Sequence, residues 1–419
     1  MSEKFNKFLF YYLGLLLFFS IIFLFKKHNV GNDSTIAEWI INYEGGFTKR
    51  GLIGQISIFF SDIFNSKLRV SILVFQIFLT SLYIILVFFL FKDIKTNKLI
   101  LLSIFTPIFI LYPVAEVEVL ARKELFIFCI FIVYIQINSK KFRNIFKLFF
   151  LPVSILIWEP VIFYFLFFIA VDIIKNDFRK LNKNFFFNIF YYIPALVPAL
   201  VIALYPMSGD EHQQMVNFLK QKYNEDCYGA CTLLESKSSI YSQFQSNFKS
   251  YSFVSFLRYF LIIIIGFGPL IILLKYSFFI NTKLLFFKKF NNLLLPISSI
   301  YIPVIVLFAM GVDWGRWVNI SYVFGITFYI YFYKKKFILI NENVFKTKFY
   351  NFINNKKIFI FIFIIFCFSW NPKTVITGDV ATNPIWKIPY NASKFIFGFD
   401  NFRIFQNHPI TIWHKKYIE

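Results

Sequence analysis

Apolar residues form long uninterrupted blocks along the chain, unlike the short periodic patterns of soluble helices and strands. Most blocks are roughly 15 to 23 residues long, the length that a helix needs to cross about 30 Å of hydrocarbon. The pattern predicts an all-α fold, a polytopic transmembrane helix bundle of about 11 membrane segments. The blocks cover residues 8–25, 70–91, 99–114, 121–137, 148–158, 161–171, 185–206, 252–274, 292–310, 318–333 and 358–371.

Two neighbouring blocks, 148–158 and 161–171, are too short to cross a bilayer singly. They flank the sequence Trp158-Glu159-Pro160, and proline cannot continue a helix without the loss of a backbone hydrogen bond. The pattern therefore predicts a re-entrant-like pair of half-helices, or two strongly tilted helices, that meet at an acidic residue.

The distribution of charge predicts how the chain is oriented. The net charge is +22, and with a cytoplasmic N-terminus the inside loops carry 24 of the 44 Lys and Arg residues but five of the 22 acidic residues. Cytoplasmic loops of membrane proteins are enriched in Lys and Arg. We therefore expect a cytoplasmic N-terminus and an extracytoplasmic C-terminus. Because the basic residues lie in short loops and form no folded basic face, we expect no nucleic-acid partner.

The polar segments suggest one membrane domain with extracytoplasmic additions. We expect a transmembrane domain over residues 1–371 and an extracytoplasmic tail over 372–419. The domain includes two long outside loops, 26–69 and 207–251. Apolar residues in the first of these loops recur at helical spacing, which predicts two helices that lie in the membrane interface.

Cysteine and histidine residues give little indication of a metal centre. Cys129 and Cys367 lie inside apolar blocks and are expected to be inert, while Cys227 and Cys231 lie close together in a polar loop where a small disulfide can form. The histidines His28, His212, His408 and His414 are scattered along the sequence. We therefore predict no metal site and no cofactor, and we expect His212 to be a solvated loop residue.

A glycine-rich stretch, 43–54, lies between the two interfacial helices of the first loop. Glycines allow backbone N–H groups to approach a ligand closely, and the N-terminus of the following helix favours an anion. Lys49 and Arg50 add positive charge at the same place, with Glu44 beside them. The stretch is a candidate pyrophosphate cradle. The alternative is a turn between surface helices whose basic pair contacts lipid headgroups.

A second charged group lies between two apolar blocks and consists of Glu116, Glu118, Arg122, Lys123 and Glu124. Ionisable residues at the edge of a membrane are costly unless paired, so they are candidates for function. In a helix, Glu118 and Arg122 are four residues apart and would pair. We consider Glu118, Arg122 and Lys123 candidate substrate-binding residues. A purely structural salt-bridge network is the alternative.

Two further outside positions complete the set of candidates. Glu159 lies between apolar half-helices, where burial raises the pKa of a carboxyl group unless a cation meets it. Asp313, Trp314 and Arg316 lie in a seven-residue outside turn. A guanidinium group suits a phosphate and tryptophan rings stack on sugars, although tryptophan also anchors proteins at membrane interfaces.

Together, the first span, the long outside loop with its interfacial helices and acid, and the many later spans resemble the GT-C superfamily of integral-membrane glycosyltransferases. The Gly45-Gly46 to Gly51 stretch, the Arg122-Lys123-Glu124 turn and loop 207–251 are similar to bacterial O-antigen polymerases. The resemblance implies a bacterial inner-membrane enzyme with a polyprenyl-linked sugar donor, a glycan acceptor and other envelope-assembly proteins as partners. The paired acids of many such enzymes' first loops are not adjacent here, where Glu38 and Glu44 are six positions apart, and the sequence has no Asp-x-Asp.

We expect from these features a glycosyltransferase of the hexosyltransferase type that acts at the extracytoplasmic face in cell-surface polysaccharide assembly. Glu44 first, and Glu159 second, would be the catalytic carboxylates. Lys49, Arg50 and the outside arginines would bind the lipid phosphates. The alternative is a flippase or transporter of lipid-linked oligosaccharides, for which charges along the middle of several spans would be expected.

Overall fold

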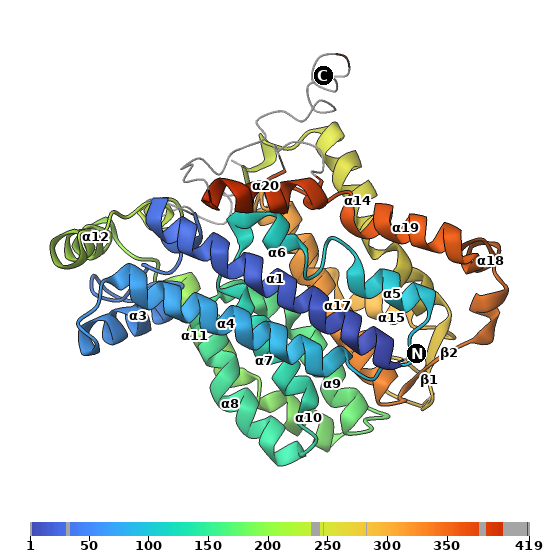
Figure 1. Cartoon of the computed structure of the whole chain (residues 1–419). Coiled ribbons are helices and arrows are strands. Elements are labelled where there is room, and N and C mark those ends of the chain that lie inside the picture. The colour runs from blue at the N-terminus through green and yellow to red at the C-terminus, as the bar shows by residue number, and fades with distance from the viewer. Residues whose placement is uncertain are drawn as a thin grey trace.

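The computed structural model is a helical protein and describes residues 2–30, 34–235, 244–245, 247–281, 283–376, 383–396 and 417. Helices cross one another in several layers (Figure 1). In the described residues, the two β-strands are β1 (Ser277–Phe279) and β2 (Ile338–Ile340), which pair antiparallel. Most of the predicted C-terminal tail, including His408 and His414, lies outside the described residues.

The first half of the chain alternates long helices with short helical turns. Its helices are α1 (Ser2–Val30), α2 (Ser34–Ala37), α3 (Gly51–Ile63), α4 (Leu68–Phe91), α5 (Lys98–Phe105), α6 (Tyr112–Ala115), η1 (Val117–Val119), α7 (Glu124–Gln136), α8 (Lys140–Ile157), η2 (Glu159–Tyr164), α9 (Phe165–Lys175), α10 (Lys183–Phe190) and α11 (Ile193–Leu204), where η marks a 3₁₀ helix.

The second half begins with a polar helix outside the bundle. Its helices are α12 (Gly209–Tyr223), η3 (Thr232–Leu234), α14 (Phe253–Lys275), α15 (Leu294–Ile300), η4 (Ile302–Val304), α16 (Ile305–Met310), α17 (Trp314–Lys334), η5 (Glu342–Lys346), α18 (Lys348–Asn354), α19 (Lys356–Phe368) and α20 (Pro384–Ile396).

Three helices, α1, α4 and α14, are long and apolar enough to cross a membrane. Two pairs of consecutive helices, α10 with α11 and α18 with α19, are also long and apolar enough if each pair counts as one span. The helices within these pairs are bent relative to each other by 44° and 101°. The described helices thus provide three to five candidate spans by length and composition. The number of about eleven membrane segments and the orientation of the chain in the membrane stay predictions.

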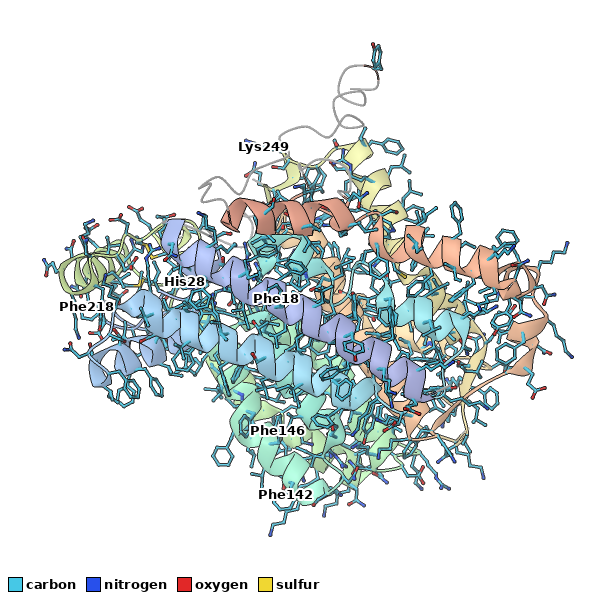
Figure 2. All side chains as sticks on the ribbon, in the orientation of Figure 1. Phe18, His28, Phe142, Phe146, Phe218 and Lys249 are labelled. Atoms are coloured by element: carbon cyan, nitrogen blue, oxygen red, sulfur yellow. A yellow bond between two sulfur atoms is a disulfide. The ribbon has the colours of Figure 1, made fainter. Side chains whose placement is uncertain are left out.

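The centre of the bundle is α17, whose side chains are buried over nearly its whole length. It packs against α4, α7 and α14, while α1 and α4 lie side by side across one face (Figure 1). Large apolar side chains also cover the outside, among them Phe18 and Phe142, which are 58% and 65% exposed (Figure 2). An apolar outer surface of this kind suits contact with lipid.

The predicted break at Trp158-Glu159-Pro160 is present. Trp158 has extended backbone angles, and η2 begins at Glu159. The helix before the break is longer than predicted, because α8 starts at Lys140 and continues through Pro152. The consequence is that the carboxylate of Glu159 lies at a helix end, where it can meet side chains from other elements.

The first outside loop differs from the prediction of two interfacial helices. Its first helix, α2, has four residues, and Trp39 is fully buried with its indole N–H donating to the Ala121 carbonyl oxygen at 3.1 Å. The second helix, α3, is present, but its buried residues include Gly54, where an added Cβ would stand 1.9 Å from the Ile41 carbonyl oxygen. The loop therefore packs into the protein.

A buried ion cluster joins α8 to α9 in segments that were predicted to be cytoplasmic loops. Asp172 accepts hydrogen bonds from Arg143 at 3.1 Å and from Lys147 at 2.7 Å, and all three side chains are almost completely buried. The Tyr192 hydroxyl donates to the same carboxylate at 2.9 Å. These basic residues therefore stabilise the fold in addition to any effect on orientation.

This cluster predicts a large effect on stability. The substitution Asp172→Ala leaves two buried cations without their anion, and we expect it to lower the free energy of unfolding by about 3–5 kcal/mol. The control is Asp226→Ala, which removes an exposed ion pair with Lys220. It should change the free energy of unfolding by less than about 1 kcal/mol. Denaturant titration in detergent micelles measures both, and equal effects would contradict the prediction.

Candidate functional site

Glu38, which follows α2, is the centre of a group of buried charges. Its carboxylate accepts a hydrogen bond from Arg122 at 3.3 Å and another from Arg316 at 3.1 Å. The three residues come from the segment between α2 and α3, the turn before α7 and the start of α17. Because Glu38 is 2% exposed, the two arginines provide charge compensation that water cannot.

The Arg316 guanidinium extends the network to two more acids. Its Nε donates to the Glu124 carboxylate, and its Nη1 donates to Asp313 at 3.2 Å. Arg122 also forms an ion pair with Asp313 at 3.7 Å. A planar guanidinium has several donors in fixed directions, which is why one arginine can join three carboxylates from separate elements.

A second group consists of Arg50, Glu159 and Lys123. Arg50 binds the Glu159 carboxylate through Nε and Nη2, with N···O distances of 2.7 to 3.1 Å. The Lys123 ammonium group donates to the Arg50 carbonyl oxygen at 2.5 Å. Because Lys123 follows Arg122 in sequence, the two groups adjoin, and we call them together the charged cluster.

Arg50 has a left-handed backbone, with φ 65° and ψ 9°, directly before α3. Such a conformation is uncommon for a residue with a Cβ and costs roughly 1–3 kcal/mol. The contacts of its side chain with Glu159 and of its carbonyl with Lys123 hold it there. Residues held in unfavourable backbone conformations concentrate at functional sites, so this position is a reason to examine the cluster for function.

The charged cluster has a buried floor and an accessible rim. Glu38, Glu124 and Arg316 are almost completely buried, whereas the side chains of Arg50, Glu159 and Asp313 are 20%, 23% and 27% exposed. Together with Arg122, Lys49 and Lys123, the cluster has five cations and four carboxylates. An anionic ligand could therefore reach Arg50 from solvent and balance the remaining positive charge.

The charges around Glu38 determine its protonation state. Burial by itself opposes ionisation, but Arg316, Arg122, Arg50 and Lys123 outweigh it and lower the pKa of Glu38 to about 2. The pKa of Glu159 is likewise held below its usual range, because Arg50 and Lys49 outweigh its burial. Both carboxylates are therefore ionised at neutral pH.

Burial has the larger effect on the two lysines of the cluster. It lowers the pKa of Lys123, in the turn before α7, to about 7, against the opposing effect of Glu38 and Glu159. It also lowers the pKa of Lys49, where Glu159 acts in the opposite direction. The positive charge available to an anion at this site thus decreases as the pH rises through about 7.

Most of the predicted site residues meet in this cluster. Lys49, Arg50, Arg122, Lys123, Glu159, Asp313 and Arg316 all contribute to it. Glu44 does not have a described contact with it: the Glu44 carboxylate is exposed and accepts a hydrogen bond from Gln55 at 2.7 Å. The structure thus favours Glu159 over Glu44 as the carboxylate closest to the cations.

Two predictions about individual residues are wrong. Glu118 lies in η1, so it does not form the helical ion pair with Arg122; the Arg122 Nε donates to the Glu118 backbone oxygen at 2.8 Å, and the Glu118 side chain is exposed. Trp314 is buried among Tyr251, Phe256 and other aromatic rings. Its ring is therefore not open for stacking on a sugar.

Sequence reasoning missed the acids at the centre of the site. Glu38 was not among the predicted site residues, and Glu124 was named in the second charged group but not as a substrate-binding residue, yet both bind Arg316. Glu116 is also buried and accepts a hydrogen bond from Lys387 of α20 at 3.0 Å. One sequence pattern could have identified these acids, namely an acidic residue with apolar neighbours. Such a residue needs a cation as its partner if the loop is buried.

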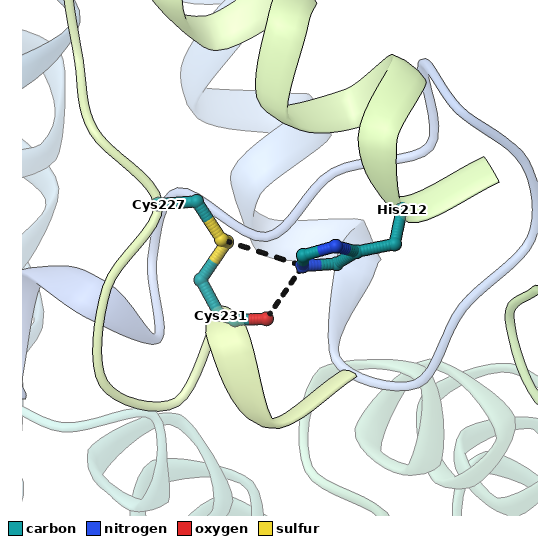
Figure 3. Close-up of side chains that lie close together, drawn as sticks. All are labelled: His212, Cys227 and Cys231. Carbon is teal, nitrogen blue, oxygen red and sulfur yellow. Dashed lines mark hydrogen bonds between the residues drawn. A yellow bond between two sulfur atoms is a disulfide. The ribbon is translucent and has the colours of Figure 1, made fainter. Parts of the chain in front are cut away.

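A separate group consists of His212 in α12, which lies at the edge of the bundle (Figure 1), and two cysteines in the loop that follows it (Figure 3). Cys227 and Cys231 form a disulfide, in agreement with the sequence. His212 is not a solvated residue: it is 4% exposed, and its Nε2 lies 3.1 Å from the Cys231 carbonyl oxygen and 3.6 Å from the Cys227 sulfur. Sulfurs joined in a disulfide are not thiolates, and thiolates are the form that binds metals.

An apolar groove of about 580 Å³ runs between α14 and α19. Its lining includes Arg258, and the hydroxyl of the neighbouring Tyr259 donates to the Lys373 carbonyl oxygen at 2.9 Å. The groove does not include the charged cluster. Its volume is in the range of ligand pockets, about 300–1,000 Å³. It is lined by Arg258, Leu261, Ile262, Ile265, Phe361, Ile362, Ile365, Phe366 and Trp370.

The fold and the apolar outer surface define the molecule as an α-helical membrane protein with several candidate spans. The chain belongs to the membrane protein family described as "Uncharacterised membrane protein Rv1490", which it matches over residues 8–251. The matched region includes Glu38, Arg50, Arg122 and Glu159. Neither the curated proteins nor the solved structures contain a match to the chain.

The charged cluster predicts a dependence of stability on pH. The folded-state pKa of Glu38, about 2, is below the value of 4.5 for an unperturbed glutamate, so its stabilising contribution is complete above about pH 4.5 and is lost as the pH falls towards 2. The substitution Glu38→Gln removes that contribution. We expect it to lower the free energy of unfolding by about 3–5 kcal/mol at pH 7. Between pH 4.5 and 2, the difference in free energy of unfolding between the variant and the wild type should narrow by about 3 kcal/mol.

The measurement is a series of denaturant titrations in detergent at several pH values. A suitable control is Glu3→Gln, which changes a largely exposed acid at the start of α1 and should leave the pH profile unaltered. A constant difference between Glu38→Gln and the wild type from pH 7 to 2 would show that the Glu38 charge does not provide the stability.

Proposed function

We propose that the protein is a membrane glycosyltransferase that takes a sugar or glycan from a polyprenyl (pyro)phosphate donor at the extracytoplasmic face. The observation that supports this most is the charged cluster, in which cations from separate parts of the chain surround accessible carboxylates. A diphosphate requires several cations close together, and a transferase also requires a carboxylate near the reacting carbon. Cell-surface polysaccharide assembly is the process that we propose for it.

The donor phosphates would bind at the rim, to Arg50 and Lys49, while the buried Lys123 ammonium group holds the Arg50 backbone through its carbonyl oxygen. Arg50 is suited to this role because its guanidinium already binds a carboxylate through two nitrogens, and phosphate oxygens accept the same two-pronged geometry. Phosphate binding would draw Arg50 away from Glu159. The buried floor formed by Glu38, Arg122 and Arg316 would stay paired and keep the rim residues in position.

Glu159 would act as the general base. While Arg50 is bound to it, its pKa is held low and it is a weak base. Loss of that partner to the donor phosphate would leave burial as the main effect, which raises the pKa of a carboxylate and strengthens it as a base. The base would therefore become active when the donor is bound.

In the transfer step, Glu159 accepts the proton of the acceptor hydroxyl, and the hydroxyl oxygen forms a bond to the anomeric carbon of the donor sugar. The bond between that carbon and the phosphate oxygen breaks, and its electron pair leaves with the lipid phosphate. Lys49 and Arg50 stabilise the charge that develops on the leaving phosphate. This step requires no metal ion or other cofactor.

The groove between α14 and α19 would hold part of the lipid chain. Its lining side chains are apolar apart from Arg258, and Tyr259 beside that arginine binds residue 373 through its hydroxyl. The Gly315 N–H, one residue before Arg316, donates to the Thr374 carbonyl oxygen at 3.1 Å. Residues 373–374 thus join this part of α14 to the charged cluster. A donor could therefore place its apolar chain against the membrane-facing helices while its phosphates reach towards the cluster.

The first test of the function is transfer by the purified protein in liposomes with a radiolabelled lipid-linked sugar and a glycan acceptor. We expect Glu159→Gln to lower kcat by about 10²- to 10⁴-fold, because it removes the base. Glu44→Gln should retain most of the activity, since Glu44 lies outside the cluster. The reverse ranking would assign the base to Glu44.

The phosphate-binding role has its own matched control. We expect Arg50→Ala to raise KM for the donor at least about tenfold, because it removes a two-pronged phosphate contact. Arg69→Ala removes a similar ion pair, between Arg69 and Glu225, at a position outside the charged cluster and should leave KM unchanged. Full transfer by both Arg50→Ala and Glu159→Gln would exclude the proposed site, and movement of the donor across the bilayer without transfer would indicate a flippase.

The lipid groove can be tested with a filled variant. Ile265→Trp places a large ring in the groove, and we expect it to raise KM several-fold for a long-chain donor but to leave KM for a short-chain donor unchanged. Phe260→Trp, at an exposed position of α14 outside the groove, is the control. An equal effect on long- and short-chain donors would contradict a role of the groove in chain binding.

A further inference from the structure

We propose that the Cys227–Cys231 disulfide is a thiol–disulfide exchange site that takes a dithiol as its substrate. Three observations point to it: the two cysteine residues differ in exposure, an imidazole lies beside the more exposed one, and the disulfide closes a very short loop. The proposal is independent of sugar transfer and concerns a different part of the molecule.

The two sulfurs have different surroundings. Cys231 is completely buried, whereas Cys227 is partly exposed. Of the two cysteines, Cys227 is therefore the one that an external thiolate can approach. Exchange requires an accessible sulfur, and a buried second cysteine beside it can re-form the disulfide.

His212 lies where it can favour a thiolate at Cys227. Its Nε2 is 3.6 Å from the Cys227 sulfur, and the residue is held in the first turn of α12 (Figure 3). A neighbouring imidazole lowers the pKa of a cysteine thiol and so raises its thiolate fraction at neutral pH. His212 is thus a positioning residue for the reaction of Cys227.

Other charged groups near this loop are already paired with one another. Glu225 binds Arg69 at 2.7 Å, and Asp226 binds Lys220 at 2.7 Å. Glu211, next to His212, accepts a hydrogen bond from the Ser208 N–H at 2.6 Å in the cap of α12. Each of these acids near Cys227 therefore has its own donor, which leaves His212 as the described group that adjoins the sulfur.

The short loop argues for reactivity rather than stability alone. The two cysteines are four positions apart, and disulfides that close short loops restrict the unfolded chain least. The loop also lies against the first outside loop, because a Cβ added at Gly229 would stand 3.4 Å from the Cβ of Ala37, beside Glu38.

The reaction with a dithiol is balanced in two steps. A thiolate of the dithiol attacks the Cys227 sulfur, a mixed disulfide forms, and Cys231 leaves as a thiolate that takes a proton from solvent. The second thiol of the dithiol, after loss of its proton, attacks the mixed disulfide and expels Cys227 as a thiolate beside His212. The Cys227 thiolate takes up the second proton, so the dithiol is oxidised to a disulfide and the protein disulfide is reduced to two thiols.

The test uses the full-length protein in detergent and the variant Cys231→Ser, in which Cys227 is a free thiol. We expect iodoacetamide to alkylate Cys227 with a pH profile whose apparent pKa is below the usual value of about 8.5 for cysteine. The addition of His212→Gln, which keeps an N–H donor but cannot become charged, should return this apparent pKa towards about 8.5. The alkylation rate at pH 7 should then fall, because less of the thiol is ionised. Far-ultraviolet circular dichroism checks that both variants are folded.

Two controls complete the test. Cys227→Ser should remove the rapid alkylation, because Cys129, Cys231 and Cys367 are buried. In the wild type, dithiothreitol should reduce the disulfide while the protein stays folded, and reduced glutathione should be less effective because it lacks the second thiol. Identical pH profiles with and without His212, or reduction only after unfolding, would overturn the proposal.

Discussion

The burial of charge is the constraint on which the described structure most depends. Glu38 is ionised in an environment that excludes water, and it is stable only because Arg122 and Arg316 reach it from distant parts of the chain. Those arginines in turn fix the turn before α7 and the start of α17. The same constraint operates elsewhere in the bundle, where Asp172 joins Arg143 and Lys147. Apolar helices pack against one another with little selectivity for a particular neighbour. The two polar clusters thus determine which helices lie together.

The sequence predicts the long helices well and the broken ones poorly. The blocks 8–25, 70–91 and 252–274 correspond to α1, α4 and α14, because an unbroken apolar run of that length has one stable structure in lipid. The block 99–114 instead ends its helix at Phe105, since the residue before Pro107 disfavours helical angles. Whether such shorter pieces cross the membrane depends on how they pack, which a hydropathy pattern does not contain.

For the site, composition identified most of the residues but not their partners. Arg122 and Glu159 were recognised as costly charges beside apolar segments, Lys49 and Arg50 as cations of a glycine-rich stretch, and Arg316 as a guanidinium suited to phosphate. The structure brings these five residues together. Which acid meets which cation depends on tertiary contacts across as many as 278 positions, and no local pattern encodes those. Trp314 shows a different error, because it was predicted to bind substrate although its ring is buried. A tryptophan at the end of a helix looks the same in the sequence whether its ring is exposed or enclosed by aromatic neighbours.

The distance in sequence between Glu38 and Arg316 has a consequence for biosynthesis. A ribosome adds about 5–20 residues per second, so the 278 positions between them separate their synthesis by roughly 15 to 55 s. During that interval the first outside loop has no Arg316 to bind, although Arg122 is already present. A nascent chain that stops before α17 would keep Glu38 and Glu124 incompletely paired. A helix synthesised late in the chain therefore completes the structure of its first loop.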